Sequence, residues 1–194
     1  MQKSAINKAI MVLKKNGVAV YPTDTAYAIG CKFTSIKAIE RIIRLKKRKD
    51  DKFTIIASSL AQVRKYFKLN ACQIKIAKKY WPGPVSIVVS PKYSVRVPKN
   101  KIARQLACGV GMPLLATSLN ISGQPAIYHI KQDGRKLPIL NGGLYGVDFV
   151  LDVGPLKKQK PSTIVECLTS KTPHFKCGVI RVLRHGPISV KISS

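Results

Sequence analysis

The chain has 194 residues, 45% of them hydrophobic, which predicts a single globular domain over residues 1–194 and excludes an intrinsically disordered protein. No apolar run approaches the roughly 20 residues that a transmembrane helix needs, and lysines interrupt the apolar N-terminus, so we expect a cytoplasmic protein without a signal peptide. The formal net charge of +27 indicates a polyanionic ligand such as ATP or tRNA, but it is equally consistent with a solvated surface that binds nothing.

The N-terminal part of the chain is expected to contain two helices and a strand. Apolar residues at helical spacing predict a helix over 6–13, which Ser4 would cap and Gly17 would end. A short buried strand is predicted over 18–21. A second helix, capped by Ser35, should place three isoleucines on one face and end in a basic run: Ile36, Ile39, Ile43 and 46–49.

The remainder of the chain is expected to add strands and shorter helices. Strands are predicted over 53–57, 85–89, 93–97, 114–117, 147–153, 163–167 and 179–183. Short helices are predicted after Ser59, after Asn70 and over 100–108. Because the two kinds of element interleave irregularly, the expected fold class is α/β (or α+β), a sheet with helices packed on it.

Several common catalytic motifs are absent from the sequence. There is no G-x-x-x-x-G-K-[ST], which excludes a P-loop enzyme, and no G-x-S-x-G nucleophile elbow. The three histidines have no ligand spacing and the five cysteines contain no C-x-x-C pair, so we predict no metal held by the protein itself. The acidic residues are few and scattered, which argues against a paired-carboxylate glycosidase.

Several segments share one arrangement, in which an element ends in a polar, small-residue or basic turn. They are 21–30, 45–48, 81–84, 94–98, 116–123, 161–163 and 182–186. Ligands of α/β proteins gather at strand ends. In the order Y-P-T-D-T, K-x-R, W-P-G-P, S-x-N and R-x-G, these segments resemble the YrdC/TsaC family of threonylcarbamoyl-AMP synthases, from about Lys8 to Gly186.

The resemblance implies a fold and a reaction. The fold would be a twisted, mixed, open sheet with flanking helices. The reaction would join L-threonine, bicarbonate (or CO2) and ATP into threonylcarbamoyl-AMP and pyrophosphate, for the threonylcarbamoyladenosine modification of tRNA. Mg²⁺ is expected to arrive with ATP, and no other cofactor is expected. Expected partners are downstream tRNA-modification proteins and, with weak affinity, tRNA or double-stranded RNA; a membrane is not expected.

The family's motifs also assign roles to individual residues. Lys46, Arg48, Ser118 and Asn120 are the expected catalytic residues, because fixed cations and hydrogen-bond donors stabilise charge on phosphate oxygens. The same four would bind ATP, together with Ser94, Leu119 and Arg184. The expected threonine-binding residues are Thr23, Arg96, Thr117 and Thr163, with Arg96 suited to a carboxylate.

Alternatives stay open at the level of sequence. The basic end of a helix and a Ser-Leu-Asn turn are both ordinary structural features, and only their order favours a function. A non-catalytic RNA-binding module would also account for the +27 charge, although the aromatic residues form no stacking motif. A carbamoyl-transferring relative with another acceptor is a third hypothesis. The sequence departs from the family's pattern at Ala28, Lys49 and Leu119, where Gly, Pro and Ala are usual.

Overall fold

A computed structural model describes residues 2–48, 50–130, 146–168 and 179–191 of the chain. The described residues form one nine-stranded sheet with the strand order β7-β1-β2-β6-β3-β5-β4-β8-β9. In chain order the strands are β1 (Ala19–Pro22), β2 (Tyr27–Lys32), β3 (Phe53–Ile56), β4 (Val85–Val88), β5 (Tyr93–Arg96), β6 (Leu114–Ser118), β7 (Phe149–Val150), β8 (Thr163–Leu168) and β9 (Val179–Arg184).

The sheet is mixed and open, as expected from the resemblance. The pairs β1–β7, β3–β5 and β4–β8 are parallel, whereas the other neighbours are antiparallel. Five helices flank it in the described part of the chain: α1 (Gln2–Lys14), α2 (Ile36–Lys46), α3 (Leu60–Tyr66), α4 (Ala71–Tyr80) and α5 (Lys101–Val110). None of these helices has both the length and the apolar character that a membrane crossing requires.

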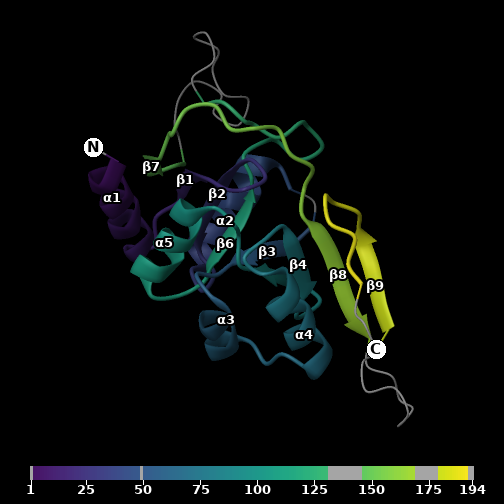
Figure 1. Cartoon of the computed structure of the whole chain (residues 1–194). Helices are drawn as coiled ribbons and strands as arrows, with labels where there is room; N and C mark the ends of the chain where they lie inside the picture. Colours follow the sequence, from purple (N-terminus) through teal and green to yellow (C-terminus); the bar gives the residue numbers. More distant parts are fainter. Residues whose placement is uncertain (1, 49, 131–145, 169–178, 192–194) are drawn as a thin grey trace.

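The helices divide between the two faces of the sheet. Successive side chains of a strand point to opposite faces, and on β1 Ala19 and Tyr21 pack in the cluster beneath α1 and α5, whereas Val20 packs in the cluster beneath α2. A third cluster joins α4 to β4 and β8. Figure 1 shows α1 and α5 together near β1 and β7, with β8 and β9 at the opposite end of the sheet. The two halves of the sheet therefore have different surroundings.

The predicted helix caps can be compared with the structure one by one. Helices α3 and α4 follow Ser59 and Asn70 as predicted, and Asn100, predicted to lie in the third of these helices, is instead its N-cap. The side chains of all three residues accept hydrogen bonds from the backbone at the N-termini of α3, α4 and α5. Ser35 occupies the N-cap of α2 but makes no side-chain capping bond. The prediction for Ser4 is wrong, because α1 already begins at Gln2.

Other local expectations are corrected by the tertiary structure. After α1 the left-handed position is taken by Asn16 (φ 63°) rather than Gly17, since Asn tolerates this conformation. Gly17 is needed for space instead, because a Cβ there would lie 2.8 Å from the Val12 carbonyl oxygen. On α2 the residues that become buried are Ala38, Ile42 and Lys46, while Ile36 is exposed. The strand predicted over 147–153 is reduced to the two residues of β7.

Candidate active site

A strip of polar side chains continues the sheet face on which α1 and α5 lie. The register places Ser94 and Arg96 of β5 beside Thr54 and Ile56 of β3, and Ile56 belongs to the apolar cluster beneath α1 and α5. The hydroxyl oxygens of Ser94 and Thr54 are 3.1 Å apart. On β4, Ser86 lies with its hydroxyl 3.0 Å from that of Ser162. On this face of the sheet the side chains are thus mainly apolar beneath α1 and α5, and polar on β5 and β4.

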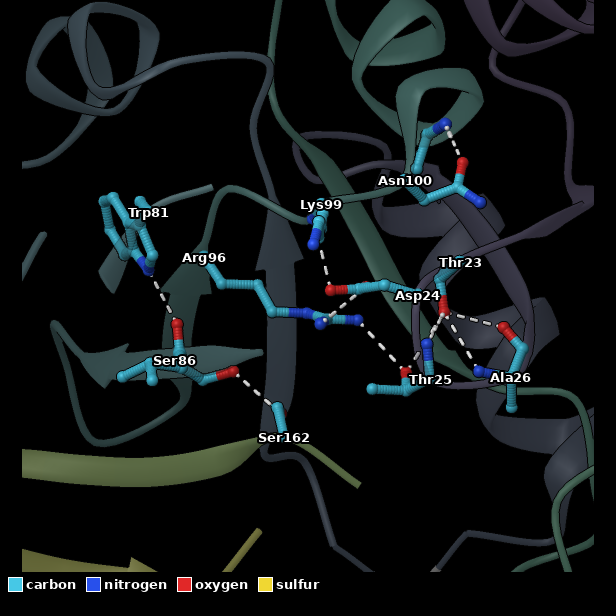
Figure 2. Close-up of polar contacts among 12 residues, drawn as sticks. Thr23, Asp24, Thr25, Ala26, Trp81, Ser86, Arg96, Lys99, Asn100 and Ser162 are labelled. Carbon is cyan, nitrogen blue, oxygen red and sulfur yellow. Dashed lines mark hydrogen bonds and ion pairs between the residues drawn. The ribbon is translucent and has the colours of Figure 1, made fainter. Parts of the chain in front are cut away.

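Arg96 is the charged centre of this strip, and the loop between β1 and β2 holds it (Figure 2). Its Nη1 donates to Asp24 Oδ1 at 2.8 Å, and its Nη2 donates to Thr25 Oγ1 at 3.2 Å. The second oxygen of Asp24 accepts the Lys99 N–H at 3.1 Å. The Arg96 Nε is buried and has no hydrogen-bond partner among the described residues. The guanidinium therefore has one N–H donor without an acceptor, which is the kind of group that a ligand carboxylate satisfies.

Thr23 lies beside Arg96 but uses its hydroxyl within its own turn. The Oγ1 donates to the Ala26 carbonyl at 2.6 Å and accepts the backbone N–H groups of Thr25 and Ala26, both at 3.2 Å. The residue is buried. Thr23 thus shapes the loop that carries Asp24, and its direct contact with threonine stays a prediction.

Lys46 joins the K-x-R motif to the S-x-N motif. It is the last residue of α2 and only 2% exposed. Its Nζ donates to the Ser118 carbonyl (2.5 Å), the Asn120 carbonyl (2.7 Å) and Asn120 Oδ1 (2.8 Å), which uses all three N–H bonds of an ammonium group. Burial, with a further contribution from the charge of Arg48, lowers the pKa of Lys46 to about 8. Lys46 positions the S-x-N loop in this structure.

Arg48 reaches the same region from the turn after α2. Lys47 adopts the left-handed conformation (φ 48°), and the Arg48 N–H closes the helix end on the Ile43 carbonyl at 3.1 Å. The guanidinium lies 4.5 Å from the centre of the Phe53 ring, pairs with Asp50 at 2.7 Å and donates to Thr117 Oγ1 at 3.1 Å. The predicted residues Arg48 and Thr117 are therefore in direct contact.

The S-x-N segment is held by bonds among its own residues and to β2. The Ser118 hydroxyl donates to Asn120 Oδ1 at 2.6 Å, and Asn120 Nδ2 donates to the Gln124 carbonyl. The side chain of Leu119 is fully buried in the cluster beneath α2, and its N–H donates to the Tyr27 carbonyl at 2.8 Å. Any contact between Leu119 and a nucleotide would have to involve its backbone carbonyl.

Arg184 and Thr163 lie at the far end of the polar strip. Arg184 donates from Nε and Nη2 to the carbonyl and hydroxyl oxygens of Ser162, both at 2.9 Å. Burial lowers the pKa of the Arg184 guanidinium, and the positive charge of Arg96 adds to this effect. Ser162, which accepts from Arg184, also contacts Ser86 on β4, so Arg184 is joined to the polar strip. Thr163 is buried and its hydroxyl donates to the Ile188 carbonyl at 2.7 Å. This bond stabilises the fold, and direct contact of Thr163 with threonine stays a prediction.

The structure thus brings the predicted residues into two groups. One contains the K-x-R and S-x-N residues with Thr117, and the other contains Thr23, Ser94, Arg96, Thr163 and Arg184 along the polar face. Sequence reasoning missed Asp24 and Ser162, which orient the two arginines. The signal for Asp24 was its place in Y-P-T-D-T in a chain with eight acidic residues. Among the described residues, no group of three or more His, Cys, Asp or Glu side chains could hold a metal ion.

Comparison with known proteins places these motifs in one family. The model of the Sua5/YciO/YrdC family, described as "Telomere recombination", matches residues 11–186. The uncharacterized protein YciO of Escherichia coli is 30% identical, over 89% of this chain and 87% of that protein. A relative from Photorhabdus laumondii named threonylcarbamoyl-AMP synthase is 34% identical, over 86% of this chain and 94% of that protein.

Solved structures agree with the sequence relatives. The crystal structure of E. coli YciO has a TM-score of 0.75 and covers 98% of this chain and 93% of its own. The P. abyssi Sua5 structure complexed with L-threonine has a TM-score of 0.74 at 26% identity and covers 93% of this chain, which spans about half (54%) of the Sua5 chain. With the family model covering most of its length, this chain belongs to the Sua5/YciO/YrdC family.

Proposed function

We propose that this chain is a threonylcarbamoyl-AMP synthase, which forms threonylcarbamoyl-AMP and pyrophosphate from L-threonine, bicarbonate and ATP. The observation that carries the proposal is the meeting of K-x-R with S-x-N, since Lys46 bonds two residues 72 and 74 positions further along the chain. The names of relatives such as the P. laumondii protein support this activity, whereas the YciO relatives have no assigned activity. The product would serve tRNA modification in the cytoplasm through downstream proteins.

Threonine would bind along the polar strip. Its carboxylate would take the unpartnered Nε edge of Arg96, which Asp24 holds in place. The amine would take up bicarbonate with loss of water, giving an N-carboxylate. Arg184 lies near enough to Arg96 to share its electrostatic environment, so the strip favours a second anionic group. The P. abyssi Sua5 complex with L-threonine is consistent with this use of the fold.

ATP would bind between the two groups of residues. The new carboxylate oxygen would attack the α-phosphorus, the P–O bond to the β-phosphate would break, and pyrophosphate would leave. Arg48 and Arg184 would donate hydrogen bonds to phosphate oxygens, where fixed donors stabilise developing charge. The Ser118 hydroxyl would do so after it turns away from Asn120, its acceptor in this structure. Lys46 would act by holding the Ser118–Asn120 loop in the required geometry, because its own N–H bonds are already used.

The protein offers little for a resident metal, so we propose that Mg²⁺ arrives bound to ATP. Asp24, the acidic partner of Arg96, has one oxygen bonded to that arginine and the other to the Lys99 backbone, and Asp50 is paired with Arg48. When bound, Mg²⁺ would neutralise phosphate charge. The protein's own residues would then bind and orient the anions around it.

Pyrophosphate release from ATP by the purified protein tests the proposed function. Release should require threonine and bicarbonate together. Arg48→Ala should reduce the rate by about a hundredfold or more, as expected for a lost charge-stabilising donor. Lys47→Gln is the matched control, because Lys47 is the neighbouring cation and its side chain makes no hydrogen bond or ion pair within the described residues. Release that does not need threonine would reject the proposal in favour of another acceptor, and no release under any of these conditions would favour a binding module.

A further inference from the structure

A cavity lies just beyond the carboxyl ends of β3 and β5, next to Arg96 but lined by none of the residues assigned to ATP and threonine. It has a volume of about 220 Å³ and is lined by Ser58 and Ser59 after β3, Val97 after β5, and Trp81 of the W-P-G-P segment. These positions follow the carboxyl ends of the parallel strands β3 and β5. Ligands of open α/β sheets bind at such ends. The W-P-G-P segment has no part in the proposed reaction and here forms one wall of the cavity.

Two cations from opposite faces of the sheet also line this cavity. Lys78 comes from α4 and Arg104 from α5. Arg104 is half-buried, and neither side chain has a hydrogen bond or ion pair within the described part of the chain. None of the nine lining residues is acidic. Two basic residues therefore line a hollow that no acidic residue lines, which favours an anionic ligand.

The chemistry of the lining residues favours a phosphate group over a carboxylate. A phosphate group carries close to two negative charges and three acceptor oxygens, which matches one guanidinium, one ammonium and the two serine hydroxyls. A carboxylate would leave one of the two cations unneutralised. Leu60, Trp81 and Val97 provide an apolar wall beside the cations. The cavity is smaller than the roughly 300–1,000 Å³ typical of drug-sized ligands, so its ligand must be small.

We propose that this cavity is a binding site for the phosphate group of a small molecule, held by Arg104 and Lys78. The site does not depend on the proposed synthase activity, because none of the residues assigned to ATP or threonine lines it. Arg104 forms paired hydrogen bonds with two phosphate oxygens, Lys78 supplies a point charge, and the Ser58 and Ser59 hydroxyls complete the set of donors.

The fluorescence of Trp81 provides a direct measurement of occupancy, since Trp81 is the chain's one tryptophan and lines the cavity. Inorganic phosphate should change this fluorescence saturably at constant ionic strength, whereas acetate at the same concentration should not. Arg104→Met and Lys78→Met should each weaken phosphate binding by about tenfold or more. Lys78 is exposed, so its replacement keeps the fold intact even if the Arg104 variant is destabilised.

Matched controls separate this site from general surface charge and from the nucleotide site. Lys75→Met on α4 and Lys101→Met on α5 remove exposed cations that do not line the cavity, and both should leave phosphate binding unchanged. Arg48→Ala should leave the Trp81 response unchanged, because Arg48 belongs to the K-x-R group. Equal losses in the control variants, a response lost in Arg48→Ala but kept in Lys78→Met, or an equal response to acetate would each overturn the proposal.

Discussion

Lys46 combines a positive charge with near-complete burial. Three oxygens, all from Ser118 and Asn120, surround its ammonium group. Removing such a group from water favours its neutral form, and the structure lowers the pKa of Lys46 to about 8. A neutral amine has only two N–H donors for these three oxygens, so loss of the proton weakens the hold on the S-x-N loop and links the geometry of the candidate site to pH.

We predict opposite pH trends for stability and activity at Lys46. Its pKa is about 8 when folded and near the ordinary 10.5 when unfolded, so between these values the unfolded chain binds more protons. The unfolding free energy of the wild type, relative to Lys46→Met, should thus rise across this window in urea titrations. Pyrophosphate release should fall across it, as the loop loses its ammonium partner. Lys46→Arg keeps its charge in this window, so its rate of pyrophosphate release should not fall with pH. A wild-type rate that stays level across the window would contradict the prediction.

The ion pair between Asp24 and Arg96 should contribute much more to stability than a surface pair. Their side chains are 12% and 5% exposed, so Asp24→Ala leaves a buried guanidinium without its carboxylate and should cost about 3–5 kcal/mol. Asp51→Ala is the matched control, because Asp51 and Lys92 are 58% and 64% exposed and should lose less than about 1 kcal/mol. Urea denaturation of both variants measures the difference, and equal losses would count against a structural role for Asp24.

At the scale of elements, the ends of the helices position the candidate site. The left-handed Lys47 ends α2, so that Lys46 and Arg48 meet the last residues of β6 from either side of the turn. The loop between β1 and β2 carries Asp24 to Arg96 on β5. Helix caps and turns are set by local hydrogen bonds. The contribution of helix caps to stability can therefore be measured at caps that do not belong to the candidate site.

The two N-caps of α4 and α2 offer such a test. Asn70 forms a capping box with Gln73, so Asn70→Ala should cost about 1 kcal/mol. Ser35 caps α2 by position but makes no side-chain bond, so Ser35→Ala should change stability by no more than about 0.5 kcal/mol. Thermal unfolding of the two variants gives the comparison. A larger loss for Ser35→Ala than for Asn70→Ala would show that the capping bonds do not determine these effects.

At the scale of the whole molecule, basic residues greatly outnumber acidic ones. Within the described part of the chain five acidic residues form ion pairs, four with arginines and one with Lys92, so most of the described lysines are in no ion pair. Lys157, Lys158 and Lys160 are examples of exposed lysines on the segment that leads to β8. Such a surface contacts phosphates without reading bases.

We therefore predict weak, sequence-independent tRNA binding that depends steeply on salt. If six to ten phosphates are contacted, raising salt from about 50 to 200 mM should weaken binding by about 10³–10⁵-fold, because counterions are released on binding. Filter binding measures this loss, and pyrophosphate release measured in parallel should need no RNA and should persist. Synthesis that requires tRNA, or RNA affinity that changes little with salt, would instead favour the RNA-binding hypothesis.

The sequence by itself determined the order of most elements and the family, because periodicity and short motifs act over a few residues. It did not indicate β2, whose residues are buried on both faces and lack alternation. Only the tertiary structure decided that the Lys46 ammonium group donates to Ser118 and Asn120. It also decided that Asp24 accepts from Arg96 and holds it in place. Those contacts join residues about 70 positions apart, and strand order and register, rather than local preference, bring such residues together.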